Sequence, residues 1–476
     1  MPKLGACAPL GLEVAPFQGP IANSIFSVQY GFKTAFTSTD QSASHNLRAS
    51  VDPVSFLFSR RLVLKSLVVA PFAAATHVAA QQTESIAALG PRLELQSKLA
   101  THTGVVVDNN EAAMVTQGSY DAMQGAIAMY EEIVAAGGWR KLPQGKFEKG
   151  VKSPKIVALR ERLVRESYLD LDALSVATPQ AYDGQVIGAV RAFQINHGLA
   201  PSGKVDARTR TAMDIAATQR LFMLQENLPR IEAYAEGLGS RNILVNIPSV
   251  QLETIENGKV YARHNIVCGK LERPTPTLMS KVTDVTFNPT WNAPASIVMR
   301  DIIPKYLKDP EYLSQLDIKV FDGVGGPEIE PSSVDWLNTP PDRYHFQQQP
   351  GDHNALATVK VNFANKFMVY MHDTPHRELF AQNARYESSG CVRVDQVRLF
   401  IDWILAGQDG FDEAQFEMIT ASQETYSVAV RTPADVRFMY LTAWATEDGR
   451  VNFRPDIYKL DGTGFIYGQP EPVEVL

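Results

Sequence analysis

Residues 370–394 read YMHDTPHRELFAQNARYESSGCVRV, a stretch that places one histidine and one cysteine beside predicted strands. Apolar and polar residues alternate over 359–363 and 367–372, which predicts a β-hairpin ending at His372. After Cys391 comes a helix with an apolar face at residues 397–404, for which Asp395 is the expected N-cap. The stretch therefore predicts a β-rich unit that carries His372 and Cys391.

The chemistry of these two side chains indicates a cysteine nucleophile with a histidine base. A free thiol has a pKa of about 8.5, so it is mostly protonated at neutral pH. An imidazole can take that proton and later return it to a leaving amine. We expect Gly390 to let a substrate carbonyl approach closely, and the N–H groups of Gly390 and Cys391 to form an oxyanion hole.

Three further residues are predicted to contact the substrate or the oxyanion. Arg393 shares a strand face with Cys391 by the period of two, where it could stabilise a thiolate or hold a substrate carboxylate. Ser389 precedes the Gly-Cys pair. Asp373 could orient His372, although its backbone carbonyl is better suited to that role than its side chain.

A metal site is not expected. His372 and His376 have the spacing of a helical metal pair, but Pro375 between them forbids an ordinary helix interior. Cys7, Cys268 and Cys391 form no CxxC pair, which gives no sign of zinc or redox chemistry, and Cys268 is interpreted as a small core residue. No cofactor is implied.

Length and composition describe a globular protein with more than one folded unit. The chain has 476 residues, too many for one ordinary core, with 45% hydrophobic and 20% charged residues. A net charge of −7 argues against nucleic acid as a partner. No apolar run approaches the roughly 18–20 residues that a membrane-spanning helix needs.

Residues 59–80 resemble an export signal of the twin-arginine class. Ser59-Arg60-Arg61 precedes an apolar stretch that ends in small residues, Val78-Ala79-Ala80. The signal begins far from residue 1, so we interpret Val51 or Val54 as the true start. The alternative is a disordered tail over 1–80 with a short hydrophobic helix. Cleavage at residue 80 would remove Cys7 and place the rest in an oxidising compartment.

The pattern along the chain predicts an α+β protein. Its catalytic domain is mostly β, and the other parts are helical. The expected division is an N-terminal extension with the signal (1–80), a helical scaffold (81–149), a three-helix unit (150–215), a scaffold helix (216–240), a catalytic domain (241–407) and a C-terminal extension (408–476). A Pro-rich insertion near 290–350, irregular around two helical patches, is expected to act as a lid or binding loop.

Residues 150–215 resemble the small three-helix peptidoglycan-binding domain. The resemblance rests on Ala192-Phe193-Gln194, Gly198-Leu199, Gly203 and Thr209, and Asp206 is expected to cap the third helix. Ser202 stands where that family usually has Asp, and Asp206 where it often has Gly. A purely structural helical unit is the alternative.

His372 followed by Ser388-Ser389-Gly390-Cys391 resembles the catalytic signature of L,D-transpeptidases. The larger periplasmic branch of that family resembles this chain over nearly its whole length. Its landmarks occur in order at 267–270, 273–276, 291–294, 354–356, 440–444 and 453–458. Departures occur at Ser389, where many members have His, at Ala357, where Gly is common, and over 347–349.

The resemblance implies a periplasmic acyltransferase of a Gram-negative bacterium. Cys391 would attack the bond between the diamino acid and D-Ala of a peptidoglycan stem peptide, release D-Ala and form a thioester. The amine of a second stem would then give a 3-3 cross-link. Family members also attach proteins to the wall, so wall-anchored outer-membrane proteins are further expected partners, and carbapenem-type β-lactams are expected to acylate Cys391. The alternatives are an L,D-carboxypeptidase or cysteine amidase, and a catalytically silent wall-binding scaffold.

Overall fold

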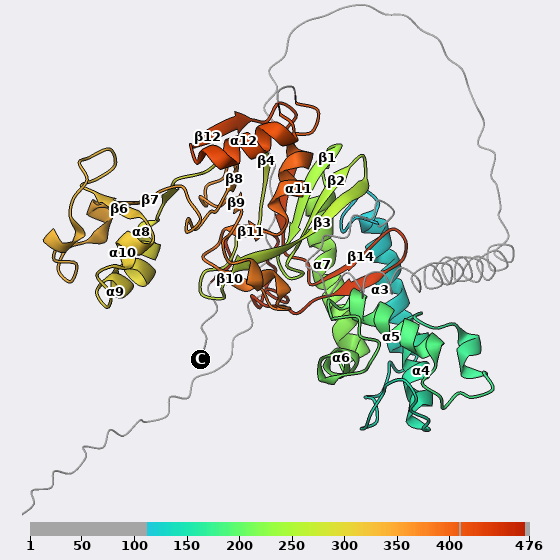
Figure 1. Ribbon diagram of the computed structural model, residues 1–476. Helices are drawn as coiled ribbons and strands as arrows, with labels where there is room; N and C mark the ends of the chain where they lie inside the picture. Colours follow the sequence, from blue (N-terminus) through green and yellow to red (C-terminus); the bar gives the residue numbers. More distant parts are fainter. Residues whose placement is uncertain (1–111, 409–410, 472–476) are drawn as a thin grey trace, which may run out of the picture. The chain divides into compact units, whose positions relative to one another are not determined.

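The computed structural model describes residues 112–408 and 411–471. The export signal, Cys7 and the first part of the helical scaffold lie outside the described residues. Helices and strands are mixed, with a β-rich unit after an N-terminal helical part, which confirms the predicted α+β class (Figure 1). In the described part of the chain, no helix combines the length and apolar character required to cross a bilayer.

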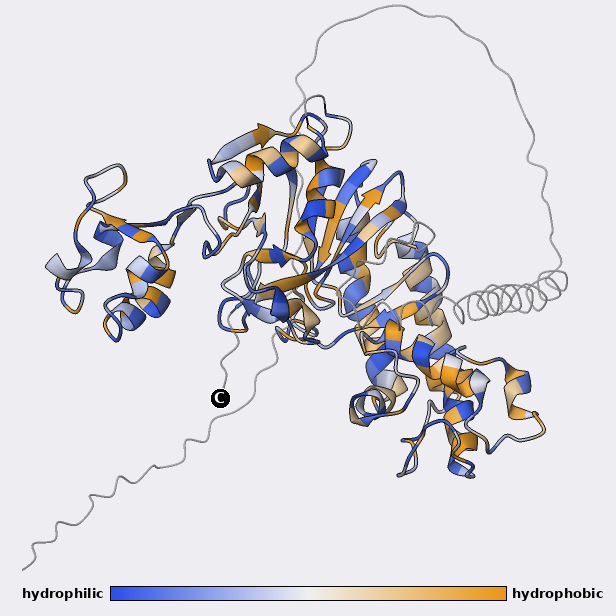
Figure 2. Ribbon diagram, in the orientation of Figure 1, coloured by the Kyte–Doolittle hydropathy of each residue, from blue (hydrophilic) through white to orange (hydrophobic). Residues whose placement is uncertain are grey.

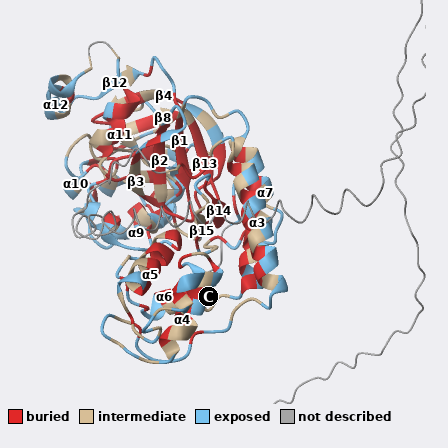
Figure 3. Ribbon diagram, turned by 90° about the vertical axis from the view of Figure 1, so that its right-hand side faces the viewer, coloured by how far each residue is buried: buried red, intermediate tan, exposed pale blue. Residues whose placement is uncertain are grey.

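Two long helices form the scaffold. In α3 (Ser119–Ala135), Met123, Ala126, Tyr130 and Ile133 recur every three or four residues, so they share one buried face. That face packs with the buried residues of α7 (Ala217–Ala235) in one apolar cluster. Figure 3 shows the two helices side by side, each banded with buried and exposed residues.

Residues 150–215 fold into the expected three-helix unit, with α4 (Lys155–Arg165), α5 (Gly184–Asn196) and α6 (Ala207–Met213). Apolar residues follow these helices, interleaved with polar ones (Figure 2). The predicted cap is confirmed, because the Asp206 carboxylate accepts a 2.8 Å hydrogen bond from the Thr209 N–H. Gln194 of the family-like motif donates to the Thr209 hydroxyl at 2.9 Å. The motif residues therefore stabilise the unit from inside.

The β-rich unit is a sheet that closes on itself. Its strand order is β10-β3-β11-β9-β8-β4-β13-β1-β2, and β2 also pairs with β3, which closes the strands from β3 to β2 into a ring with β10 at its edge. The strands are β1 (Arg241–Asn246), β2 (Gln251–Glu256), β3 (Lys259–Gly269), β4 (Leu278–Phe287), β8 (Val359–Phe363), β9 (Met371–His372), β10 (Tyr386–Ser388), β11 (Val392–Val394) and β13 (Asp435–Met439). Their inward residues and helix α11 (Val397–Ile404) share one apolar core, which includes Cys268 as expected.

The sheet extends past residue 407, which is where the sequence-based division ends the catalytic domain. Strand β13 lies between β4 and β1, and β12 (Tyr426–Ala429) pairs with β4. The chain then forms the hairpin β14 (Ala443–Ala445) and β15 (Val451–Phe453), which joins the cluster under α3 and α7. Residues 408–476 are therefore part of the central fold rather than a separate extension. Strand β13 pairs in parallel with β1, and parallel strands need a long connection between them, so the partner of β1 comes from far along the chain.

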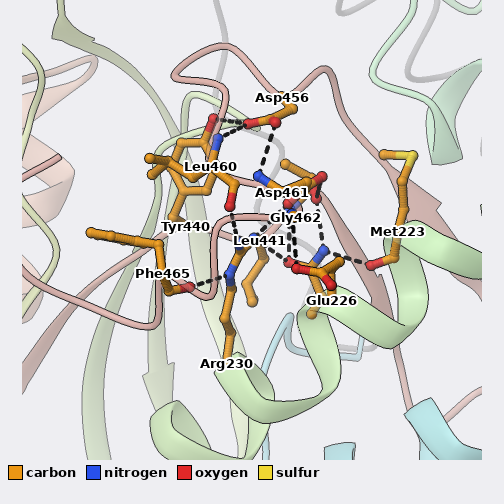
Figure 4. A network of polar contacts seen from close by, with 12 residues as sticks. Met223, Glu226, Arg230, Tyr440, Leu441, Asp456, Leu460, Asp461, Gly462 and Phe465 are labelled. Carbon is orange, nitrogen blue, oxygen red and sulfur yellow. Dashed lines mark hydrogen bonds and ion pairs between the residues drawn. The ribbon is translucent and has the colours of Figure 1, made fainter. Parts of the chain in front are cut away.

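A buried polar network connects the C-terminal segment around residues 460–465 to α7 (Figure 4). Arg230 of α7 is fully buried and forms an ion pair of 2.7 Å with Asp461. Its guanidinium also donates to the carbonyl oxygens of Leu460 and Phe465, each at 2.9 Å. All of these contacts reach across more than two hundred residues of sequence, so they close the fold.

The insertion is more ordered than its Pro-rich sequence suggests. It holds a three-stranded sheet of order β5-β7-β6, from β5 (Trp291–Asn292), β6 (Ile318–Phe321) and β7 (His345–Gln348). Short helical segments α8 (Ala295–Ile297), η2 (Val298–Ile302), α9 (Ile303–Tyr306) and α10 (Tyr312–Gln315) accompany it. Val298, Ile302, Leu313, Trp336 and Phe346 are the buried centre of its own apolar cluster. The helical patches expected here are present, whereas the three-stranded sheet was not expected from the sequence, and we call residues 290–350 the insert.

Candidate active site

Three neighbouring strands bring the candidate residues to one face of the sheet. Lys360 on β8 pairs with His372 on β9, and His372 pairs with Arg393 on β11. Side chains of directly paired residues point to the same face, and so do residues two apart on a strand, which adds Tyr370 and Cys391. The Tyr370 and His372 rings lie 5.5 Å apart, and the Lys360 ammonium lies 4.4 Å from the centre of the Tyr370 ring.

His372 is held as a neutral base. Its Nδ1 lies 2.5 Å from the backbone oxygen of Asp373. A carbonyl can only accept, so Nδ1 carries the proton and Nε2 keeps its lone pair. Burial, then the charge of Arg393 and that of Lys360, lower the pKa of His372 to about 3, against the bond to Asp373, which raises it. The imidazole therefore stays unprotonated, with the lone pair of Nε2 available, throughout the neutral range.

Cys391 follows a tight turn that its neighbours stabilise. The Ser388 hydroxyl donates to the Cys391 carbonyl at 2.5 Å and accepts from the Gly390 N–H at 3.2 Å. Gly390 has φ = +116°, a conformation that favours glycine. Burial raises the pKa of the Cys391 thiol, while hydrogen bonding from Tyr370 and the charges of Lys360 and Arg393 lower it. Neutral thiol and neutral imidazole are thus the resting forms.

The expected oxyanion donors are not equivalent in the structure. The N–H of Gly390 is taken by the Ser388 hydroxyl, so the N–H of Cys391 is the one that the turn leaves available. A developing oxyanion at Cys391 would also lie within the field of the two nearby cations, Lys360 and Arg393. The glycine is needed chiefly for its backbone conformation.

Two predicted residues have roles other than those expected of their side chains. The Asp373 carboxylate is buried against the Thr358 hydroxyl, at 2.7 Å, and Arg377 at 3.3 Å. It therefore reaches His372 only through its backbone oxygen. Ser389 is exposed and accepts a 2.9 Å hydrogen bond from Arg273, which also forms a 2.5 Å ion pair with Asp301 of the insert. Within the described residues, no cluster of metal-ligating side chains occurs.

Two parts of this chain match known protein families. Residues 240–418 match the family of L,D-transpeptidase catalytic domains called YkuD, and residues 152–213 match a putative peptidoglycan binding domain. Residues 240–418 are an L,D-transpeptidase catalytic domain. A putative L,D-transpeptidase of Haemophilus influenzae is 35% identical over 254 residues, which cover 53% of this chain and 50% of the relative. The chain thus spans about half the length of that curated relative.

Solved structures resemble this chain only loosely. An L,D-transpeptidase from Xylanimonas cellulosilytica is 14% identical with a TM-score of 0.20, over 62% of this chain and 98% of that one. An L,D-transpeptidase from Mycobacterium smegmatis is 13% identical with a TM-score of 0.21, over 42% of this chain and 58% of that one.

Two residues of the L,D-transpeptidase domain's site escaped the sequence interpretation. Tyr370 was not assigned to the site, yet its ring lies 5.5 Å from that of His372 and its hydroxyl is one of the groups that lower the pKa of the Cys391 thiol. Lys360 was passed over as a polar residue of an alternating strand. The predicted hairpin, with strands at 359–363 and 367–372, would place Lys360 opposite Tyr370, whereas in the structure β9 covers only Met371–His372 and Lys360 lies opposite His372, so the predicted register could not have found it.

Proposed function

We propose that this protein is an L,D-transpeptidase that forms 3-3 cross-links in peptidoglycan through a thioester on Cys391. One observation carries the proposal. The half-buried thiol of Cys391 and the neutral imidazole of His372 lie on one face of the sheet, and both lie near the same two cations, Lys360 and Arg393. That arrangement suits a nucleophile that loses its proton only when a carbonyl is bound.

The proposed reaction has two acyl-transfer steps. The Cys391 sulfur attacks the carbonyl between the diamino acid and D-Ala, and its proton passes to Nε2 of His372. The tetrahedral intermediate collapses, the C–N bond breaks, and His372 gives the proton to the leaving amine of D-Ala. A side-chain amine of a second stem then attacks the thioester carbonyl and gives its proton to His372; the C–S bond breaks, and His372 returns the proton to the sulfur, which regenerates the thiol of Cys391.

Peptidoglycan is the partner that both domains support. The peptidoglycan binding domain would hold the wall while the catalytic domain reacts with its stem peptides, so we propose action outside the cytoplasm, in the periplasm. The same thioester could transfer a stem to an amine of a wall-anchored outer-membrane protein. Carbapenem-type β-lactams would acylate the same sulfur, since their strained amide is an electrophilic carbonyl.

The first experiment incubates the purified protein with tetrapeptide muropeptides and analyses the products by mass spectrometry. A dimer formed with loss of D-Ala is expected, and Cys391→Ala should give none. The matched control is Cys268→Ala, because Cys268 is fully buried in the core and should be dispensable for chemistry. Tripeptide without dimer would replace the proposal with the carboxypeptidase, in which water is the acceptor. No change with the unmodified protein would favour a wall-binding scaffold.

A further inference from the structure

One face of the insert's three-stranded sheet is packed, and the other is not. Ile318, Val320 and Phe346 are buried on the packed face, against the helical segments of the insert. Because side chains alternate along each strand, the residues between them point the other way. That second face, which we call the amide face, carries six residues, none of them buried: Asn292, Lys319, Phe321, His345, Gln347 and Gln349.

Three amide side chains on this face are hydrogen-bonded in a row. Oδ1 of Asn292 accepts from Nε2 of Gln347 and from Nε2 of His345, each at 3.0 Å. Oε1 of Gln347 in turn accepts from Nε2 of Gln349 at 3.2 Å. Among the described residues, no hydrogen bond engages Nδ2 of Asn292 or Oε1 of Gln349. The row therefore offers amide donors at one end and a carbonyl acceptor at the other.

The amide face adds an aromatic ring and carries no unbalanced lysine charge. The ring of Phe321 lies 6.2 Å from that of His345, directly across the strand pair. The ammonium of Lys319 lies 3.3 Å from the carboxylate of Glu328, which offsets its charge. A ligand that matches this face is electrically neutral, rich in hydrogen-bonding groups and able to pack a flat apolar side on a ring.

N-acetylated amino sugars have these properties. The hydroxyl groups of a pyranose both donate and accept, and one side of the ring presents C–H groups that pack on an aromatic face. The acetamido group is itself an amide, so it can accept from Nδ2 of Asn292 and donate to Oε1 of Gln349. A stem peptide suits the face less well, because its free carboxylates and amine would lose water here without a partner of opposite charge.

The amide face lies at the base of the insert. The insert is joined to the catalytic sheet through the chain before β5 and after β7, the two strands that carry the row of amides (Figure 1). Strand β5 begins at Trp291, shortly after β4 ends at Phe287. The Asn354 side chain donates to the carbonyl oxygens of Pro289 and Gln349, at 3.0 and 2.8 Å, and so holds the two connecting segments together. A polymer bound here would carry its side groups close to the catalytic sheet.

We propose that the amide face binds the glycan strand of peptidoglycan, a polymer of N-acetylated amino sugars that is neutral wherever stem peptides are attached. Asn292, Gln347 and Gln349 contact the acetamido groups, and Phe321 packs on a sugar ring. The inference rests on the proposed function for the choice of polymer, and it adds a sugar site separate from the strands that carry Cys391 and His372. It also gives a role to residues 347–349, where the sequence departs from its family.

The test titrates the full-length protein with chitopentaose, a neutral pentamer of N-acetylglucosamine. Hydrogen–deuterium exchange is measured by mass spectrometry, and the concentration that slows exchange over residues 345–349 gives the affinity at the insert alone, whatever the peptidoglycan binding domain contributes. Gln347→Met removes the middle amide of the row and weakens this affinity about 3- to 10-fold, as the loss of neutral hydrogen bonds does. Asn292→Ala, at an exposed position, is a second variant with the same expected effect.

Gln315→Met is the matched control. Gln315 is an exposed amide of the same insert, but it lies on α10, whose Leu313 packs against the other face of the sheet. This variant keeps the full affinity for chitopentaose. Cellopentaose, which has the same backbone without acetamido groups, binds more weakly than chitopentaose. Equal affinities for the two pentamers, or the same loss in Gln315→Met as in Gln347→Met, would overturn the inference.

Failure of this inference can be told from failure of the proposed function. Unchanged exchange over 345–349 at saturating chitopentaose, with D-Ala release from stem peptides by the unmodified protein, would overturn the sugar site and uphold the transpeptidase. Protection of 345–349 by chitopentaose without any D-Ala release would support the sugar site and refute the proposed reaction.

Discussion

At the scale of single residues, the candidate site holds the thiol of Cys391 and the imidazole of His372 uncharged. A resting thiolate–imidazolium pair would need a histidine that is easily protonated, whereas burial and two cations lower the pKa of His372 to about 3. The same burial raises the pKa of Cys391. An uncharged thiol is less open to adventitious oxidation, which is consistent with the proposed action in the periplasm.

This charge state predicts the pH dependence of alkylation at Cys391. His372 stays neutral above its lowered pKa, so no group titrates near pH 6.5 to create a thiolate. Iodoacetamide modification, followed by peptide mass mapping, should therefore rise continuously between about pH 6 and about pH 9 as the thiol ionises. Cys268 is the internal control: burial raises the pKa of its thiol to about 12, and it should stay unmodified. A rate plateau already reached by neutral pH would mean a resting ion pair.

At the scale of elements, the turn before β11 depends on Gly390. At φ = +116° a side chain is strained whatever the space around it, at an expected cost of about 1–3 kcal/mol. Gly390→Ala should therefore shift the Cys391 sulfur and abolish both D-Ala release and carbapenem adduct formation, measured by mass, in protein that is still folded. Gly407→Ala is the control, because Gly407 has φ = +71° with open space around it after α11. Loss of activity in both variants would point to general destabilisation instead.

Element prediction from the sequence succeeded where periodicity was local. The strand β8 and the helix α11 follow from alternating and helical spacing of apolar residues, whereas the second strand of the hairpin was expected over 367–372 and β9 covers only Met371–His372. The expected Asp395 cap was wrong: Gln396 occupies the N-cap position with φ = +49°, and the Asp395 carboxylate accepts from the Gln396 N–H instead. Local sequence cannot reveal such a shift, because the carbonyl of Asp395 is held by His264 of β3.

At the scale of the whole molecule, the site depends on strands that are far apart in sequence. Lys360, His372 and Arg393 meet through a register that no single segment encodes, which explains why Cys391 and His372 could be singled out from their residue types and Lys360 was missed. In the same way, β13 lies between β4 and β1 in the sheet, although both strands come much earlier in the sequence. Chemistry could be predicted from residue types, whereas the partners of each strand could not.

The network around Arg230 predicts where the closed fold is most easily broken. Arg230→Met would leave Asp461 buried without its ion pair and the carbonyl oxygens of Leu460 and Phe465 without donors. Loss of one partner of a buried pair costs about 3–5 kcal/mol, so urea unfolding should shift to markedly lower concentration. Lys319→Met removes a 3.3 Å ion pair with Glu328 whose two side chains are each about half exposed, and it should leave the midpoint nearly unchanged. Equal midpoints for the two variants would mean that the last segment is not fastened to α7 through Arg230, and closure of the sheet would then rest on strand pairing alone.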